Sequence, residues 1–195
     1  MKNLLVLLMA LGLVTVTNAQ VKNSNFRVSW SVAIPMGDLS DYISQTSLRG
    51  ASLEYNWLLK PNLEVGLESG WNLLYERVDD KVYTYETASV SGVQYRYTNT
   101  IPIIAGVKML AKSKSGLTPY GGVGVGTMYI NRNTDFGLYR ITTNTWQFSV
   151  RPEVGLRYNY KNGMGFLLGA KYYANSSNDD LNAQSYLAIN LGLVF

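Results

Sequence analysis

Bulky apolar residues recur at every second position through most of this 195-residue chain. The last ten residues show the pattern most clearly. One alternate set is large and apolar (Leu187, Ile189, Leu191, Leu193, Phe195), and the other is mostly small or polar (Ala188, Asn190, Gly192, Val194). Successive side chains of a β-strand point to opposite faces, so this alternation predicts a strand with one heavy apolar face. That face must lie against a protein core or against lipid.

Eight such segments are predicted, at roughly 26–36, 49–59, 63–76, 93–110, 117–131, 145–160, 164–174 and 184–195. The connectors between them alternate in length. Three are short, at 60–62, 111–116 and 161–163, and four are longer and polar, at about 37–48, 77–92, 132–144 and 175–183. Short and long connectors then lie at opposite ends of an up-and-down array. This sorting predicts an all-β fold, an eight-stranded antiparallel transmembrane β-barrel with short periplasmic turns and four longer extracellular loops.

The volume of the side chains decides which face points inward. The bulky set holds more than thirty large residues, including all four tryptophans (Trp30, Trp57, Trp71, Trp146). The interior of an eight-stranded barrel is only just wide enough for modest side chains. The bulky face is therefore predicted to point outward into lipid. Aromatic residues near both strand ends are typical of the two interfacial girdles of such barrels.

The opposite face is small and polar and carries charges of both signs. Nine charged residues fall on it (Arg27, Lys108, Arg151, Arg157, Lys171, Glu54, Glu64, Glu68, Glu153). The near balance is what burial requires, because an unpaired buried charge is costly. Glu54, Glu68, Arg151, Glu153 and Arg157 are interpreted as an interior network that fills the barrel and fixes strand register. The alternative is a catalytic carboxylate pair with positive helpers, which would need an accessible cleft.

A few residues fit the strand pattern poorly. Ser69 and Asn99 fall on the lipid face, and we expect a β-bulge near either to rotate it inward. Pro35, Pro102 and Pro152 lie within strands, where proline cannot donate to the ladder. At Pro152 we expect a local bulge or a missing hydrogen bond.

The N-terminus has the features of a secretory signal peptide. Lys2 precedes an 11-residue apolar stretch, Leu4–Val14, and Thr17-Asn18-Ala19 resembles a cleavage site. We predict a signal peptide at 1–19, cleaved after Ala19, followed by one domain at 20–195. Removal of Lys2 lowers the net charge from +4 to +3, with no basic stripe that would suit nucleic acid.

The absence of both Cys and His removes disulfides, thiolate chemistry, the usual zinc sites and His-based triads. No cofactor, metal or catalytic residue is predicted. The glycines between Gly121 and Gly126 lack the spacing of a phosphate-binding loop and the helix that would follow one. The loop Asn175–Asn182 could hold a divalent cation, but a solvated loop is the favoured interpretation because it lacks the spacing of an EF-hand.

The segment Pro119–Tyr129, "PYGGVGVGTMY", and the closing "LAINLGLVF" resemble the porin-like outer-membrane β-barrel domain family of Gram-negative bacteria. The resemblance covers essentially all of 20–195. It implies a location in the outer membrane after Sec-type export, and contact with outer-membrane lipid and lipopolysaccharide. It also implies that the assembly machinery recognises the last strand, with Phe195 as the signal.

Three functions remain open from the sequence. The first is a non-enzymatic, monomeric barrel with a filled interior and a structural, recognition or adhesion role through its outer loops, with an unidentified extracellular ligand. The second is a narrow passive pore for small solutes, and the third is a lipid-modifying enzyme. The Tyr-rich flanks of the second long connector (Tyr83, Tyr85, Tyr95, Tyr97) could extend the sheet above the membrane and offer a binding edge.

Overall fold

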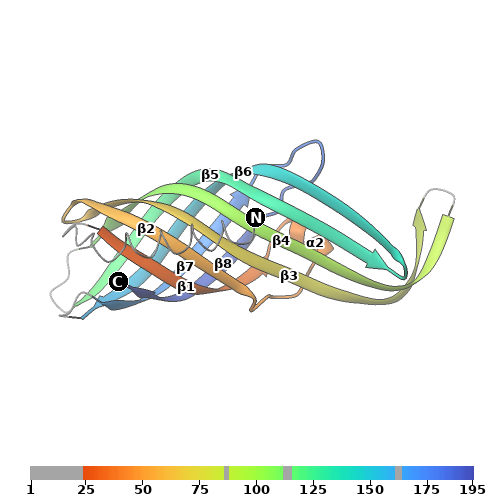
Figure 1. Ribbon diagram of the computed structural model, residues 1–195, viewed down its shortest axis with the longest axis horizontal. Coiled ribbons are helices and arrows are strands. Elements are labelled where there is room, and N and C mark those ends of the chain that lie inside the picture. The colour runs from red at the N-terminus through yellow and green to blue at the C-terminus, as the bar shows by residue number, and fades with distance from the viewer. Residues whose placement is uncertain (1–23, 86–87, 112–115, 161–163) are drawn as a thin grey trace, which may run out of the picture.

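The computed structural model describes residues 24–85, 88–111, 116–160 and 164–195, and the predicted signal peptide lies outside them. The described chain forms eight strands and one short helix, shown in Figure 1. Their bounds are β1 (Ser24–Pro35), α2 (Asp38–Tyr42), β2 (Gly50–Lys60), β3 (Leu63–Tyr85), β4 (Ala88–Leu110), β5 (Leu117–Phe136), β6 (Tyr139–Asn159), β7 (Gly165–Asn175) and β8 (Tyr186–Val194). No helix in these ranges is long and apolar enough to cross a membrane.

The strands form a closed antiparallel barrel in the order of the sequence. Closure comes from β1, which pairs with β2 on one side and with β8 on the other. Beyond β8, the backbone N–H of Phe195 donates to the Phe26 carbonyl at 2.8 Å, and the Phe26 N–H donates back to the Phe195 carbonyl at 3.0 Å. The predicted eight-stranded up-and-down barrel is confirmed.

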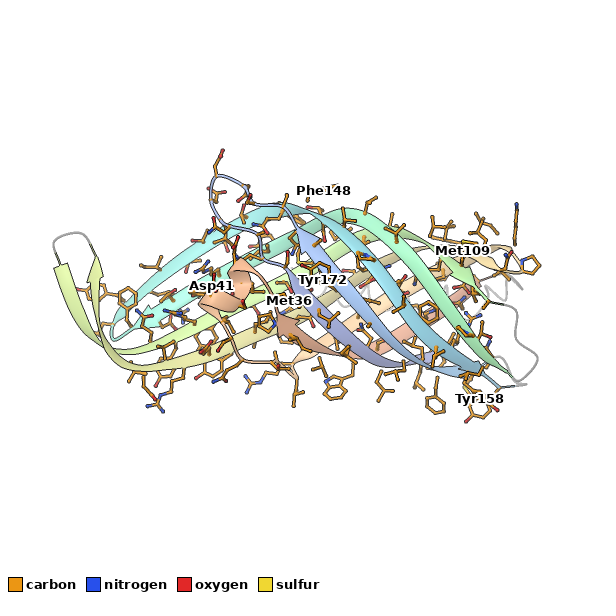
Figure 2. All side chains as sticks on the ribbon, turned by 180° about the vertical axis from the view of Figure 1, so that it is seen from behind. Met36, Asp41, Met109, Phe148, Tyr158 and Tyr172 are labelled. Carbon is orange, nitrogen blue, oxygen red and sulfur yellow. The ribbon has the colours of Figure 1, made fainter. Side chains whose placement is uncertain are left out.

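The outward face is the bulky one, as predicted. Trp30, Leu67, Phe148 and Phe166 are each about half exposed, although large apolar residues are normally buried in a water-soluble protein. Figure 2 shows Met109, Phe148 and Tyr158 projecting away from the barrel wall. A surface of this kind is stable when hydrocarbon rather than water surrounds it.

Two of the four long connectors are shorter than expected. Segment 77–92 continues β3 and β4, which pair as far as Tyr85 and Ala88, and segment 132–144 continues β5 and β6 as far as Phe136 and Tyr139. Figure 1 shows both hairpins running on past α2. The sequence suggested loops because Asn, Thr, Arg and Tyr occupy both faces there, so the apolar alternation that marks a strand is absent.

The expected bulge at Ser69 or Asn99 was wrong. Leu53 pairs with Ser69 and Leu73 pairs with Asn99 in unbroken registers, and Ser69 stays exposed on the outer face. Pro152 has the effect expected of a missing donor. The β6–β7 pairing skips Pro152 and resumes at Glu153 in the same register, which matches a missing hydrogen bond rather than a bulge.

Candidate functional site: a filled barrel and a protruding sheet

The nine inward-facing charges form one connected network, called here the charged layer. Each carboxylate contacts at least two cations. Glu54 contacts Arg27, Lys108 and Lys171; Glu64 contacts Arg27 and Arg157; Glu68 contacts Arg151 and Lys171; and Glu153 contacts Lys108 and Arg151. The four carboxylates are at most 4% exposed. All five residues singled out from the sequence therefore lie in this layer, and Arg157 joins it through Glu64 at 2.7 Å.

Three glycines of β5 make room for the charged layer. A Cβ on Gly122 would lie 2.5 Å from the Val107 carbonyl oxygen and 2.9 Å from Lys108 Cγ. A Cβ on Gly124 would lie 2.5 Å from Ile104, and one on Gly126 would lie 2.1 Å from the Ile103 carbonyl oxygen. These glycines therefore permit a close approach of strand and side chain, and the space beside them is filled by protein.

The half of the interior nearer the long connectors contains an apolar cluster, called here the apolar layer, which was not predicted from the sequence, beside buried neutral polar residues such as Thr98 and Gln147. This apolar layer has wall residues from six strands and three residues from the first long connector, all buried (Ala33, Leu74, Ile104, Met128, Ile130, Tyr173, Tyr186, Ala188 with Leu39, Tyr42, Ile43). The rings of Tyr173 and Tyr186 stack at 4.7 Å, and the Tyr173 hydroxyl donates to Glu68. That bond joins the apolar layer to the charged layer.

The connector between β1 and β2, which contains α2, closes this end of the barrel. Ser47 and Ala33 exchange two backbone hydrogen bonds of 2.8 Å, which folds the connector back along β1. The Tyr42 hydroxyl donates to the Asn133 carbonyl at 2.9 Å, and the Arg132 guanidinium lies 3.3 Å from the centre of the Tyr42 ring. Leu39 and Ile43 are fully buried beneath it. The connector is thus a packed lid rather than an open loop.

The other end of the barrel is narrowed by aromatic and aliphatic residues. Leu110, Tyr120, Leu167 and Val194 are buried there. The Tyr120 hydroxyl lies over Gly155 and Gly169, where an added Cβ would come within 2.6 Å of it. The interior is therefore occupied by side chains from end to end along the described strands.

The loop suggested as a cation site uses its polar groups to hold itself in place. Asp180 accepts a hydrogen bond from Thr145 Oγ1 at 3.1 Å, and Asn178 donates to the Thr145 hydroxyl at 2.6 Å and to the Trp146 carbonyl at 3.0 Å. Within the described ranges, no three His, Cys, Asp or Glu side chains are grouped so that they could hold a metal ion. The polar side chains of Asn178 and Asp180 therefore hold the loop against β6.

Strands β3 to β6 continue beyond the barrel as a four-stranded sheet, called here the protruding sheet. Its β6 side is open, because β7 stops pairing with β6 at Ser149 while β6 begins at Tyr139. The carbonyls of Phe148 and Trp146 are covered by the β7–β8 connector. Arg140, Thr142 and Asn144 occupy the same alternate positions of β6 as Trp146 and Phe148. Their backbone N–H and C=O groups therefore face the open side.

The tip of the protruding sheet combines exposed apolar residues with an ion pair. Leu138 is fully exposed, Tyr139 is 74% exposed and Ile141 is 46% exposed. On the outer face, Arg140 donates two hydrogen bonds to Asp135, of 2.6 and 2.7 Å. These hydrogen bonds from the guanidinium lower the pKa of the Asp135 carboxyl below its usual range. The edge is therefore β-prone and alternates apolar side chains (Tyr139, Ile141) with polar ones (Thr142, Asn144), and its nearest charges neutralise each other.

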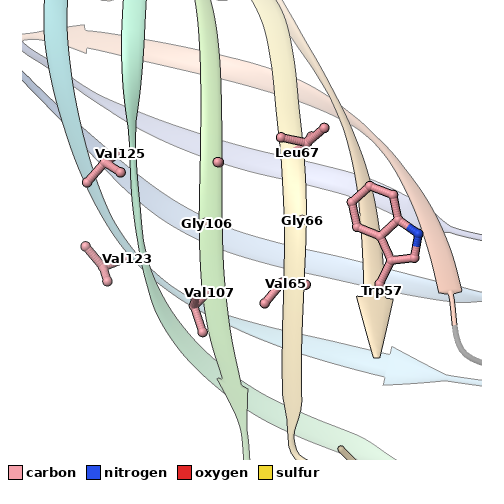
Figure 3. A pocket seen from close by; sticks show the side chains of 9 residues that line it. Trp57, Val65, Gly66, Leu67, Gly106, Val107, Val123 and Val125 are labelled. Carbon is pink, nitrogen blue, oxygen red and sulfur yellow. The ribbon is translucent and has the colours of Figure 1, made fainter. Parts of the chain in front are cut away.

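A hollow of about 550 Å³ lies on the outer surface nearer the short-turn end, shown in Figure 3. It forms because Ala105 is a small outward residue between its larger cross-strand neighbours Leu67 and Val125. Trp57, Val65, Val107 and Val123 complete its walls. The hollow belongs to the lipid-facing surface, and its apolar lining suits acyl chains.

A closed eight-stranded ring with an apolar outside and a charged inside defines the chain as a small transmembrane β-barrel. The family model described as "Outer membrane protein beta-barrel domain" matches residues 5–195. The chain belongs to this family and is an outer-membrane protein. No curated protein sequence matches it.

Solved structures of other outer-membrane proteins share the fold. Neisserial surface protein A matches with a TM-score of 0.56 and 10% identity, covering 88% of this chain and 95% of that one. Ail, the attachment invasion locus protein of Yersinia pestis, matches at 0.54 and 12%, covering 89% and 98%. The outer membrane protease OmpT from Escherichia coli matches at 0.52 and 9%, covering 90% and 97%. At these identities the likeness shows the fold alone.

Proposed function

We propose that this protein is a non-enzymatic, non-conducting outer-membrane barrel that recognises an extended polypeptide outside the cell through the open β6 edge of its protruding sheet. The observation that carries the proposal is that edge: about seven residues, from Tyr139 to Thr145, paired on one side only. An unpaired edge is a template for strand addition, which natural proteins usually cover or break with charge. Here the edge instead leads to an exposed apolar tip.

The filled interior supports a function outside the barrel. A pore would need a continuous aqueous path, but the charged layer, the apolar layer and the lid lie in series along the axis. An acid–base pair would need access to a substrate. The interior carboxylates are each bound to two or three cations and are buried. Recognition at the outer surface requires neither an aqueous path through the barrel nor an accessible pair of interior carboxylates.

Strand addition also explains which residues would select the partner. Main-chain hydrogen bonds from Arg140, Thr142 and Asn144 would supply affinity, and alternate side chains would supply specificity. On the inner face Tyr139 and Ile141 would favour apolar residues at alternate partner positions. Ail is named for attachment and invasion, which agrees with a recognition role on this fold.

The test is selection of random peptides against the protein in lipid nanodiscs. We expect the selected peptides to alternate apolar with polar residues and to protect the amides of residues 140, 142 and 144 from hydrogen exchange. Thr142→Pro removes one edge donor without disturbing the pairing of β5, and Ile141→Lys places a charge on the edge. Both should abolish binding, whereas Asn159→Leu, at the other end of β6, should not. Binding that survives both edge variants would refute the proposal.

A further inference from the structure

A row of side-chain amides crosses the outer face of the sheet where it leaves the barrel. Asn99, Asn131 and Asn144 lie directly opposite one another on β4, β5 and β6. Asn131 donates to Asn144 Oδ1 at 2.5 Å, and Asn99 donates to Asn131 Oδ1 at 3.4 Å. The indole N–H of Trp71 on β3 donates to Asn99 Oδ1 at 3.1 Å. This amide row therefore spans four strands and fixes the orientation of its own amides.

An aromatic pair lies just below the amide row, on the barrel side. Tyr129 and Trp146 are cross-strand partners with ring centres 5.2 Å apart, and the Tyr129 hydroxyl donates to Asn144 Oδ1 at 3.3 Å. Two residues along a strand separate the two rows, a rise of about 7 Å. The polar layer of a bilayer leaflet is roughly 5–8 Å thick. With the aromatic pair at the interface, the amide row lies at the depth of the lipid headgroups.

The amide row is confined to one flank of the barrel. On the opposite flank, where β1 leads into the lid, the exposed side chains near this end include Met36 and Leu48, which are 40% and 61% exposed. Trp30 there donates its indole N–H to the Leu48 carbonyl, so the contact is internal. Gln45 and Arg49 are also exposed on that flank, so β4 to β6 are distinguished by a connected row of uncharged amides rather than by polarity alone.

The chemistry of the row suits sugars better than phosphates. Its members are uncharged, and the ion pair further out on β5 and β6, Asp135 with Arg140, lies four residues away and is internally neutralised. Amides donate and accept together, as sugar hydroxyls do, whereas phosphate recognition calls for Arg or Lys. Asn144 is exposed and acts only as an acceptor in the row's contacts, so its NH2 group can donate to a ligand.

We propose that Asn99, Asn131 and Asn144, with the rings of Tyr129 and Trp146, bind the sugar headgroup of an outer-leaflet glycolipid, lipopolysaccharide. The rings contact the less polar faces of the sugars, and the amides bind hydroxyls around them. The site lies in the membrane plane on the outside of the barrel, so its ligand arrives from within the leaflet. It is separate from the open β6 edge, whose partner arrives from solution.

The experiment titrates lipopolysaccharide into the detergent-solubilised protein and follows tryptophan fluorescence, because Trp71 and Trp146 border the row. Phosphatidylglycerol, an anionic lipid with no sugar ring, and soluble core oligosaccharide are titrated in parallel. Asn131→Leu/Asn144→Leu removes the centre of the row on the outer face. Asn144→Ala is a milder second variant, and Asn159→Leu removes an exposed amide at the opposite end of β6.

The expected result is preferential binding of lipopolysaccharide by the wild type, weakened about tenfold in the double variant through loss of one or two hydrogen bonds. Asn144→Ala should show a smaller loss, and Asn159→Leu should match the wild type. The proposal is overturned if the double variant binds as the wild type does, if phosphatidylglycerol binds equally well, or if the soluble oligosaccharide binds with the affinity of the intact lipid. A heat-modifiable band on unboiled gels confirms that each variant is folded.

Discussion

The two layers inside this barrel are stabilised in different ways. The charged layer holds four carboxylates and five cations that satisfy one another at the cost of desolvation. The apolar layer has a few neutral polar contacts and is stabilised by packing against Leu39, Tyr42 and Ile43 of the lid. The comparison shows that one interior can be filled either by strand residues that pair across the lumen or by a connector folded into it.

The largest expected effect is loss of a carboxylate at the centre of the charged layer. Glu54→Ala leaves Arg27, Lys108 and Lys171 without their shared partner. We expect the free energy of unfolding to fall by about 3–5 kcal/mol, as for other buried pairs broken on one side. Urea titration in lipid vesicles, followed by tryptophan fluorescence, measures it. Asp79→Ala, at a carboxylate that is 88% exposed, is the control. Equal losses of stability in both variants would show that the ion pairs of Glu54 do not stabilise the barrel.

The apolar layer is tested by truncating its lid. Leu39 is fully buried, so Leu39→Ala should cost about 2–5 kcal/mol by creating a cavity. Protease cleavage within 36–49 should accelerate in the same variant, because this packing acts together with the Ser47–Ala33 and Tyr42–Asn133 hydrogen bonds to hold the lid. Leu48→Ala, in the same connector but 61% exposed, should change stability by less than about 0.5 kcal/mol. A lid that stays protected in Leu39→Ala would contradict the packing account.

Substitution of a β5 glycine beside the charged layer should have an intermediate effect on stability. Gly122→Ala forces a Cβ against the Val107 carbonyl and Lys108, and overpacking of this kind costs about 1–3 kcal/mol. The neighbouring Gly121 has no heavy atom closer than 3.7 Å to the same added Cβ, so Gly121→Ala should be tolerated. Unfolding midpoints of the two variants, measured side by side, should therefore differ. Equal midpoints would show that close packing against Val107 and Lys108 is not the reason for glycine at position 122.

The charged layer was predictable because polar residues on one alternate face cannot point into lipid. Arg27, Glu54 and Lys171 could therefore be placed inside from the strand period alone. The apolar layer was not predictable in the same way. Ile104 lies between the apolar outward residues Ile103 and Ala105, so alternation is lost there, and the burial of Leu39 depends on a tertiary contact with distant strands.

The protruding sheet was missed as strands for a related reason. Residues such as Asn133 and Thr142 are polar on a face that meets water, and nothing in their pattern distinguishes a solvated strand from a loop. Their pairing follows from the strands below them, which already hold β5 and β6 in register. The open edge likewise follows from where β7 ends, which only the assembled sheet shows.

The smallest expected effect lies outside both layers, at the ion pair between Asp135 and Arg140. Because its pKa is lowered in the folded protein, Asp135 contributes stability above its unfolded pKa and loses it as the pH falls through the folded pKa. The protection factors of amides at the tip of the protruding sheet, which correct for the slower intrinsic exchange in acid, should therefore fall as the pH is lowered while those in the barrel stay unchanged. Arg140→Ala should remove this pH dependence. Identical pH profiles in the two proteins would show that the pair does not order the tip.

The central claim is that the two layers together close the barrel, and single-channel recording in planar bilayers tests it most directly. The account predicts no steady openings from the wild-type protein or from Glu68→Ala alone, because the apolar layer and the lid remain in series with the charged layer, whereas Glu68→Ala combined with Leu39→Ala should leak. Regular openings of the wild type, at a conductance that neither substitution alters, would contradict it.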